Sequence, residues 1–408
     1  MSLRFDPSGY PGRRPDGPVL VHGGDVRPLS LDGTSVEPFA STPGVPVLEP
    51  GAVRYSVAYG ANASPERLAD KALDRRGAVL LPARMAGWSP AFEGRRTGYG
   101  AVPLTLVPAP GRVVDTWVLG VHVEDLEVLD RTEGRVADGA PDERPPDHPD
   151  DPVRAPPGAY VLGRIGDVAV ADRFVLPEAL AFLPGPSTAV QLDDAGRWRT
   201  WPEHDQVAAA DHVDRAGPTA SVDGDVAPVL GPWPRTPLGD LSLFVYGTLG
   251  PGGDAWSLVA DLVEVVGEAT VAGRLHDPGH GWPAADLTDP TSRIAGQATD
   301  VVDPAAAVVD PRVGPRPAGP PDGSVPAADL TDPAAVVRGV LLAPRGPEVA
   351  PELFDRADRY EGAPALFRRV AVVASIAGER RWAAAYTWAE GTPPGPTLPD
   401  GRWPPPRR

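Results

Sequence analysis

The sequence predicts two related domains in tandem, because one short cassette occurs in each half of the 408-residue chain. In the first half a strand-like run ends in Tyr59-Gly60-Ala61-Asn62, and Glu133 follows much later. In the second half Tyr246-Gly247-Thr248-Leu249 ends a similar run, and Glu361 follows after a longer interval. A glycine-containing turn paired with a distant carboxylate is typical of catalytic sites. Its recurrence in the same order favours duplication of a whole domain.

A second duplication explains why the two intervals differ. The segment Pro-Ala-Ala-Asp-Leu-Thr-Asp-Pro stands at 283–290 and again at 326–333. Removing one period of this repeat makes the interval from Gly247 to Glu361 nearly equal to that from Gly60 to Glu133. We therefore predict a disordered insertion at about 287–329, in a second domain of otherwise similar length.

Proline and glycine indicate where the domains begin and end. The chain holds 54 prolines and 46 glycines, yet 42% of its residues are apolar, so folded cores must alternate with segments rich in these two residues. The predicted order is an irregular N-terminal arm at 1–50, a first domain at 51–203 with an acidic proline-rich loop at 136–158, a linker at 204–239, a second domain at 240–390, and a disordered proline-rich tail at 391–408.

The first domain is expected to mix short strands with short helices. A strand leads from Arg54 into Gly60, and Ser64-Pro65-Glu66 then supplies a helix start with a capping serine, a proline and an acidic first turn. Apolar residues at three-residue steps predict a second helix that delivers Glu133 just past its end. The remaining predictions are strands at 79–81, 102–106 and 116–121, the helix at 123–131, and final core elements at 160–165 and 174–182.

The second domain is expected to follow the same plan. Its leading strand at 241–246 ends in the glycine turn, and a helix at 352–359 comes just before Glu361. The other predicted elements are a short helix at 256–262 and strands at 271–275, 336–342, 369–376 and 382–388.

Composition excludes several classes of function. The chain has 55 acidic and 38 basic residues, a formal charge of −17, which repels phosphate backbones and disfavours nucleic-acid binding. The absence of cysteine excludes disulfides, thiolate metal sites and a cysteine nucleophile. The sequence shows no signal-peptide core and no apolar run of membrane-spanning length. We therefore expect a cytoplasmic protein without membrane or nucleic-acid partners.

The repeated turn and glutamate together suggest acid–base chemistry. Glycine at 60 and 247 permits a positive φ and the close approach of a ligand to the main chain. Successive main-chain N–H groups in such a turn form a cradle for a carboxylate. A glutamate facing the cradle could act as a base on an amine and then as an acid on a leaving group. For either half alone, the alternative is a strand-ending turn and a helix-capping Glu-Gly pair.

Other motifs support no rival chemistry. His276 and His280 are four residues apart, but Pro278 and Gly279 between them prevent a shared helical face for a metal. The glycine-rich run at 250–253 lacks the lysine ending of a phosphate-binding loop. No Gly-x-Ser-x-Gly motif is present, so serine-hydrolase chemistry is unsupported.

The complete pattern resembles the γ-glutamylcyclotransferase superfamily. Residues 240–390 resemble its branch of γ-glutamylamine cyclotransferases and plant avirulence-induced proteins, and the first half resembles a branch with a Tyr-Gly-Ser-Asn turn. Two departures are Ala61 in place of that serine and Phe367 in place of a common tyrosine. The second-half resemblance rests on the motifs at 244–249, 281–284, 337–341, 358–362, 367–370 and 385–388, and the first-half resemblance on those at 58–62, 106–111 and 125–134.

The resemblance implies a fold and an activity. The fold is α+β, with two tandem small mixed β-barrels flanked by short helices. Glu361 and Glu133 would be the catalytic acid/base residues, and the turns Tyr246-Gly247-Thr248-Leu249 and Tyr59-Gly60-Ala61-Asn62 would hold a γ-glutamyl group. The free α-amine of this small-molecule substrate attacks its own γ-carbonyl, which releases 5-oxoproline and an amine. No metal or organic cofactor is implied.

Two alternatives remain open from the sequence. The pockets could bind a small carboxylate without catalysis, because Ala61 and Phe367 each lack a hydroxyl found in the family. Alternatively, only the second domain is active, and the first stabilises or regulates it.

Overall fold

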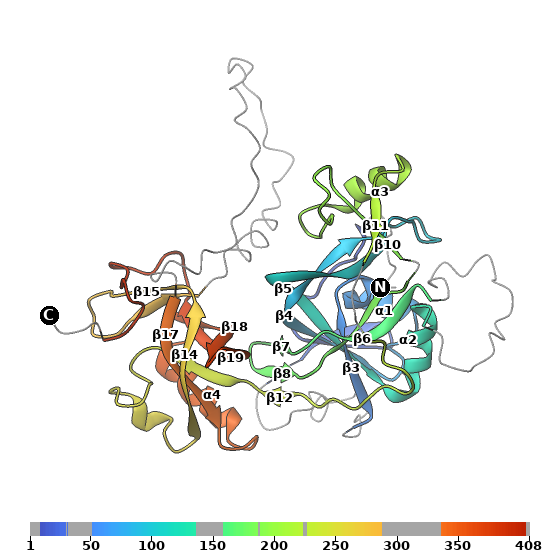
Figure 1. Ribbon diagram of the computed structural model, residues 1–408. Helices are drawn as coiled ribbons and strands as arrows, with labels where there is room; N and C mark the ends of the chain where they lie inside the picture. Colours follow the sequence, from blue (N-terminus) through green and yellow to red (C-terminus); the bar gives the residue numbers. More distant parts are fainter. Residues whose placement is uncertain are drawn as a thin grey trace, which may run out of the picture.

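The computed structural model describes residues 9–29, 31, 51–135, 158–186, 188–222, 227–287 and 336–404. Figure 1 shows two lobes, the first built from the blue-to-green part of the chain and the second from the yellow-to-red part. The acidic loop predicted at 136–158 and the insertion predicted at about 287–329 lie outside the described residues, except for Gly158 and Leu287.

The first half is organised around two long neighbouring strands, β4 (Ala78–Phe92) and β5 (Leu104–His122). They pair antiparallel along most of their length, with an irregularity between Ala86 and Trp88. The ten-stranded sheet has the order β12-β8-β7-β4-β5-β3-β9-β6, and β1 pairs with both β4 and β2. The other bounds are β1 (Val19–His22), β2 (Asp25–Pro28), β3 (Val53–Ala58), β6 (Tyr160–Arg164), β7 (Val168–Val170), β8 (Phe174–Leu176), β9 (Leu180–Pro184) and β12 (Gly239–Asp240).

This sheet is a half-barrel, which corrects the expectation of a closed barrel in the first half. Among the described strands, the outermost members β12 and β6 do not pair with each other. β12 lies on the segment that leads into the second half and pairs with β8. The outer edge of β6 is met instead by an isolated bridge between Gly163 and Pro228. The sheet edge is therefore covered by a connecting segment, which protects it without closing the barrel.

The second half forms a closed barrel, so the mixed barrel predicted there is confirmed. Its strands are arranged in the order β13-β17-β14-β18-β19, and β13 pairs antiparallel with β17 and parallel with β19. The apolar face of α4 packs Leu353, Phe354 and Ala357 into the core that the strands share. The bounds are β13 (Ser242–Val245), β14 (Val263–Ala272), β17 (Val336–Pro344), α4 (Ala350–Glu361), β18 (Phe367–Ile376) and β19 (Glu379–Trp388).

Short helices and hairpins complete the two halves. The predicted helix start at Ser64 is confirmed by α1 (Pro65–Asp70), but the Ser64 hydroxyl bonds to the Glu66 carboxylate and does not cap the helix. The helix predicted at 123–131 is covered by η3 (Val123–Asp125) with α2 (Leu126–Thr132). None of the described helices has the length and apolar character needed to cross a membrane. The remaining elements are η2 (Ala61–Ala63), α3 (Gln206–Asp214), η4 (Trp256–Leu258), and the strand pairs β10 (Ala189–Gln191) with β11 (Thr219–Ser221) and β15 (Arg274–His276) with β16 (Ala284–Asp286).

Three segments predicted to be irregular contain ordered structure. The N-terminal arm includes the β1–β2 hairpin, whose Val21 is fully buried, and the linker includes α3, whose Ala209 joins the core of the first half. In the tail, Leu398 is buried and its N–H donates to the carbonyl of Leu275 at 2.7 Å. The content of proline and glycine did not reveal this ordered structure, because each segment is ordered by contacts with residues distant in the sequence.

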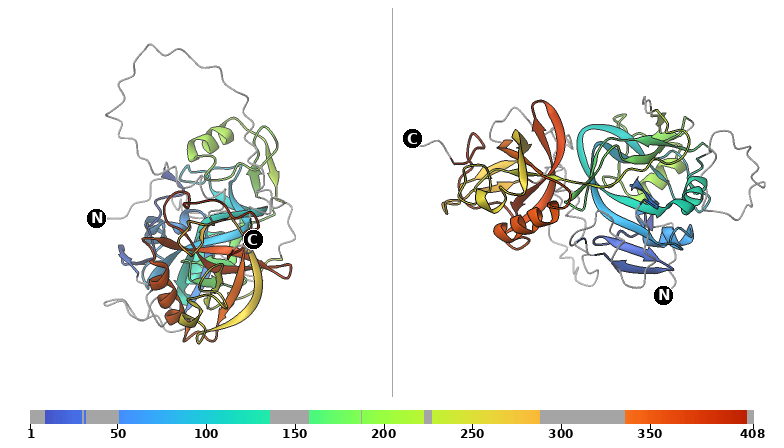
Figure 2. Two further views of the ribbon diagram at one scale, coloured as in Figure 1. Left: turned by 90° about the vertical axis from the view of Figure 1, so that its left-hand side faces the viewer. Right: turned by 90° about the horizontal axis from the view of Figure 1, so that it is seen from below.

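The two halves are joined by specific hydrogen bonds where they meet in Figure 2. Asp172 accepts a hydrogen bond from the main-chain N–H of Ala371 at 2.8 Å, and Arg84 donates to the carbonyl of the same alanine. Trp382 donates its indole N–H to the carbonyl of Asp167 at 2.8 Å. Burial raises the pKa of Asp172, so its carboxylate depends on the Ala371 N–H and the nearby Arg84 in place of solvent.

Asp172→Ala is expected to lower the free energy of unfolding by about 1–3 kcal/mol, because it leaves the Ala371 N–H at the interface without this acceptor. The measurement is the shift in the urea unfolding midpoint. Asp115→Ala is the matched control, since the Asp115 side chain is 63% exposed and lies 3.5 Å from the same Arg84; its effect should stay within about 0.5 kcal/mol. Equal effects of the two substitutions would contradict a stabilising role for the Asp172 contact.

Candidate active site

The second glycine turn follows directly from β13. A Cβ at Gly247 would meet Pro283 Cγ at 2.8 Å, and one at Gly60 would meet the Tyr10 hydroxyl at 3.0 Å, so close packing explains both glycines. The predicted positive φ is wrong at both positions, since Gly60 has a φ of −103° and Gly247 is not among the positive-φ residues. Among the described residues, the N–H groups of Thr248 and Leu249 donate to no carbonyl, which leaves them available to a ligand.

Glu361 is the last residue of α4, and a glycine fixes where that helix ends. Gly362 adopts the left-handed conformation, with φ 63° and ψ 34°, and its N–H donates to the carbonyl of Asp358. This conformation suits glycine and terminates the helix. Because the apolar face of α4 is buried in the barrel, the end of the helix and its glutamate are held at a defined place.

The carboxyl group of Glu361 faces a cavity of about 200 Å³. Burial raises the pKa of Glu361 to about 7. Within the described part of the chain, no hydrogen bond or ion pair involves this side chain, so nothing offsets its desolvation. A carboxyl group of this kind changes protonation state near neutral pH, as a general acid/base requires. The cavity is lined by the turn residues Tyr246, Gly247, Thr248 and Leu249 together with Trp282, Pro283, Tyr360, Phe367 and Tyr386.

Hydroxyl groups fix the geometry beside Glu361. Thr248 Oγ1 lies 2.8 Å from the hydroxyl of Tyr360, the residue before the glutamate. The Tyr246 hydroxyl donates to the carbonyl of Tyr386 at 2.6 Å, and Tyr386 donates its own hydroxyl to Asp358 at 2.6 Å. The turn, the end of α4 and β19 are therefore linked by side-chain hydrogen bonds around the cavity.

One wall of this cavity is aromatic. Trp282 stacks on Trp388 with ring centroids 6.2 Å apart and contacts Phe367 edge-on at 5.8 Å. Phe367 also meets Trp388 edge-on at 5.5 Å. The hydroxyl missing at Phe367 is thus replaced by an apolar edge in a three-ring cluster. Such a wall suits the apolar part of a ligand.

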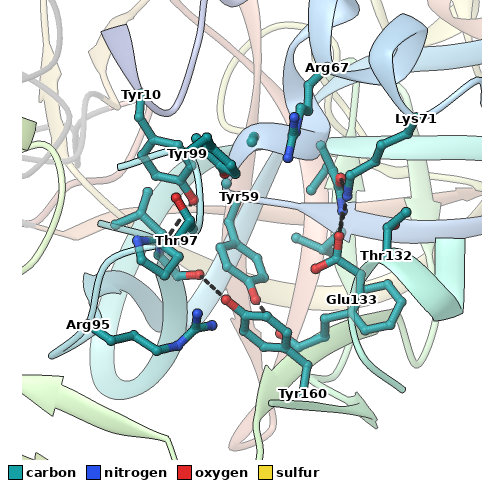
Figure 3. A pocket seen from close by; sticks show the side chains of 18 residues that line it. Tyr10, Tyr59, Arg67, Lys71, Arg95, Thr97, Tyr99, Thr132, Glu133 and Tyr160 are labelled. Carbon is teal, nitrogen blue, oxygen red and sulfur yellow. Dashed lines mark hydrogen bonds and ion pairs between the residues drawn. The ribbon is translucent and has the colours of Figure 1, made fainter. Parts of the chain in front are cut away.

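The first cavity holds its glutamate differently, as Figure 3 shows. Glu133 caps α2, and its carboxylate accepts a hydrogen bond from Lys71 and another from Asn62 Nδ2 at 3.1 Å. Lys71 also donates to Asn62 Oδ1 at 2.7 Å. Lys71 is 7% exposed, and burial lowers its pKa. Glu133 is therefore half of a buried ion pair, whereas Glu361 is not.

The N-terminal arm contributes to this first cavity. Tyr10 lines it and accepts a hydrogen bond from the N–H of Leu104 at 2.9 Å. Arg14 donates to the carbonyls of Gly60 at 2.8 Å and Tyr59 at 3.1 Å, so the arm holds the turn by its carbonyl groups. The N–H groups of the next two turn residues, 61 and 62, donate to no carbonyl among the described residues. Arm and turn thus form one unit.

The structure brings the predicted site residues together in two separate cavities. Tyr59, Gly60, Ala61 and Asn62 line the first with Glu133, and Tyr246, Gly247, Thr248 and Leu249 line the second with Glu361. Lys71, Tyr10 and Arg14 were not predicted from the sequence, because they belong to no repeat or motif. Trp282 and Tyr386 lie within the motifs on which the family resemblance rests. Across the described residues, no group of three or more histidine, aspartate or glutamate side chains could hold a metal ion.

No family model matches this chain, and no curated protein matches it. Solved structures do. Its structural neighbours are γ-glutamyl cyclotransferase-like proteins. An AIG2-like protein from Mus musculus is 15% identical, with 38% of this chain and 80% of that one covered and a TM-score of 0.23. A structure titled gamma-glutamyl cyclotransferase is 18% identical, with 34% and 72% covered and a TM-score of 0.25.

One neighbour extends over both halves. YkqA from Bacillus subtilis is 11% identical, with 84% of this chain and 87% of that one covered and a TM-score of 0.23. Likenesses of this size carry no argument about what the present chain binds or does.

Proposed function

We propose that the cavity at Glu361 releases 5-oxoproline from a γ-glutamyl amine or amide. The observation that carries this proposal is a half-buried glutamate with a pKa raised to about 7, facing a turn with available N–H groups. A base is needed because the substrate α-amine is protonated at neutral pH. The N–H groups of Thr248 and Leu249 would hold the substrate carboxylate.

The proposed reaction needs one carboxyl group and no cofactor. The α-ammonium group first loses one proton to solvent through Glu361. Its nitrogen then attacks the γ-carbonyl carbon and forms the carbon–nitrogen bond of a five-membered lactam, and Glu361 takes the second proton from that nitrogen. The protonated Glu361 returns that proton to the leaving nitrogen as its bond to the γ-carbon breaks. Holding the amine and the carbonyl of one molecule in register supplies much of the acceleration. The aromatic wall of Trp282 and Phe367 would contact the leaving amine.

The Glu361 cavity is the better candidate of the two for this chemistry. Glu133 shares its carboxylate with Lys71 and Asn62, so taking up a proton would cost it an ion pair. Glu361 has no such partner among the described residues. This contrast favours an active second half with a first half that binds without catalysing.

We also infer that the two halves derive from one domain. In each, the strand that ends in the glycine turn pairs antiparallel with a longer strand and parallel with a late strand: β3 with β5 and β9, and β13 with β17 and β19. In each, the facing glutamate stands at the end of a short helix, α2 or α4. Shared topology at the turn and glutamate supports duplication more directly than sequence spacing does.

The test is a 5-oxoproline release assay on the full chain with γ-glutamyl amines, γ-glutamyl amino acids and glutathione. We expect turnover of at least one compound, with γ-glutamyl alkylamines preferred because they place an apolar group against Trp282. No release from any compound, with binding of 5-oxoproline retained, would favour the alternative of a non-catalytic carboxylate-binding module.

A further inference from the structure

Asp358 lies one turn before Glu361 on α4 and joins that end of the helix to the barrel. Its Oδ1 accepts a hydrogen bond from the Tyr386 hydroxyl at 2.6 Å, and its Oδ2 lies 2.7 Å from Nη1 of Arg369. Arg369 belongs to β18 and Tyr386 to β19, and the two residues are directly opposite each other in the strand pairing. A single carboxylate therefore ties the helix to two neighbouring strands.

The surroundings of this carboxylate strengthen the contact. Tyr386 is 2% exposed, and the Asp358 and Arg369 side chains are 33% and 20% exposed. The Arg369 guanidinium also lies over the Phe354 ring of α4, 5.0 Å from its centroid, so the arginine contacts the helix at two points. Hydrogen bonds that involve a charged group are stronger than neutral ones, and shielding from water strengthens them further. We refer to Asp358, Arg369 and Tyr386 as the α4 clamp.

The α4 clamp reaches the opposite side of the cavity through the main chain of Tyr386. The Tyr386 carbonyl accepts a hydrogen bond from the Tyr246 hydroxyl at 2.6 Å, and Tyr246 begins the glycine turn. Tyr246 and Tyr386 both line the cavity, whereas Asp358 does not. The clamp therefore connects the helix that carries Glu361 with the turn that faces it, without itself occupying the space open to a ligand.

This connection bears on Glu361 because its carboxyl group makes no hydrogen bond or ion pair with the described residues. Its place is set by the helix that carries it, and the place of that helix end depends on the α4 clamp. A shift of the last turn of α4 would move the acid/base away from the position that the glycine turn gives the substrate. Misplacement by about 1 Å can cost about 100-fold in rate.

We propose that Asp358 is a positioning residue for the reaction at Glu361, which holds Tyr386 and the end of α4 in a fixed relation to the glycine turn. The inference rests on the proposed cyclotransferase function and adds to it a residue that touches neither the substrate nor the cavity. It also gives Arg369 a role, as the cation that keeps the Asp358 carboxylate charged and oriented.

Initial rates of 5-oxoproline release by variants of the full chain test this proposal. Asp358→Ala removes both contacts and should lower kcat by about 10–100-fold, with KM changed by less than about 3-fold, because the glycine turn still binds substrate. Asp358→Asn keeps one acceptor for Tyr386 and should recover part of this loss. Asp355→Ala is the matched control, since Asp355 is an exposed aspartate on the same helix, and its rate should equal that of wild type.

A double-mutant cycle shows whether Asp358 acts through Tyr386. Tyr386→Phe removes the hydroxyl that bonds to Asp358, so adding Asp358→Ala to it should cost much less than Asp358→Ala costs alone. Two losses that simply multiply would overturn the proposal, as would a kcat of Asp358→Ala equal to that of wild type. Circular dichroism and thermal unfolding establish that each variant is folded. If Asp358→Ala is not folded, Asp358→Asn decides, and a wild-type kcat for it would overturn the proposal.

Crystal structures separate this proposal from the function on which it rests. If wild type releases no 5-oxoproline from any compound, the proposed function fails, and the place of the Glu361 carboxyl group in wild type and Asp358→Asn then decides the positioning role. A carboxyl group displaced from its position relative to the Thr248 main-chain nitrogen would support that role. An unchanged position would overturn it.

Discussion

Glu361→Gln is expected to reduce 5-oxoproline release by about 10²–10⁴-fold, the range that general acid–base catalysis supplies. Glutamine keeps the shape of the side chain, so the turn and the aromatic wall should still bind substrate. The loss should therefore appear in kcat more than in KM. The measurement is initial rates over a range of concentrations of the preferred γ-glutamyl compound.

Two variants make this result specific. Glu352→Gln changes another glutamate on α4, one that is exposed and paired with Arg356, and should leave the rate unchanged. Glu133→Gln should reduce the rate less than Glu361→Gln, because Glu133 is held by Lys71. If Glu133→Gln caused the greater loss, the first cavity would be the catalytic one and the ranking of the two sites would be reversed.

The same substitution is expected to stabilise the protein at neutral pH. The pKa of Glu361 is about 7 in the folded state, against 4.5 for an unperturbed glutamate. The folded state therefore holds this proton more tightly, and wild-type stability falls as the pH rises from 4.5 to 7. Glutamine has no proton to lose, so the advantage of Glu361→Gln should grow by roughly 2 kcal/mol between about pH 5.5 and pH 8.

Thermal unfolding at the two pH values measures this effect. An advantage of roughly 2 kcal/mol corresponds to a rise of several degrees in Tm for a domain of this size. Glu352→Gln again serves as the control and should show no pH-dependent difference. A Tm difference between Glu361→Gln and wild type that is the same at both pH values would mean that burial does not raise the pKa of Glu361.

The parts of the site that recur in the sequence could be predicted, and the parts that occur once could not. The two turns and their glutamates were found because each pair appears in the same order in both halves. Lys71 was not predicted, because it follows α1 outside any motif and only the fold brings it close to Glu133. Tyr10 and Arg14 were not predicted either, because the arm that carries them reaches the turn from a distant part of the sequence.

The fold shows the same division. Strands and helices with clear local patterns, such as α1 and the barrel strands β13, β17, β18 and β19, lie where their residues predicted them. The strand predicted at 271–275 is wrong, because β14 covers Val263–Ala272 and β15 begins at Arg274. The half-barrel could not be predicted, because its edge strand β12 consists of Gly239 and Asp240 and is defined only by pairing with β8. The reason for the turn glycines was also misjudged. Glycine is required at these positions because a Cβ would crowd Pro283 and Tyr10. Reasoning from φ alone does not take such contacts into account.

The packing of the tail bears on how this chain tolerates changes in length. Residues 288–335 connect Leu287 to β17, and the tail bonds on both sides of that connection: to Leu275 before it and, through the Gly401 carbonyl, to the N–H of Arg338 after it. Leu287 is itself anchored, since its N–H donates to Thr387 Oγ1 at 3.0 Å. Both ends of the connection are thus fastened to the barrel independently of what joins them. Because these anchors lie on described residues at either end, a change in the number of residues between them should leave the barrel contacts in place. The tail would then be the element that makes this part of the chain a permissive place for new sequence.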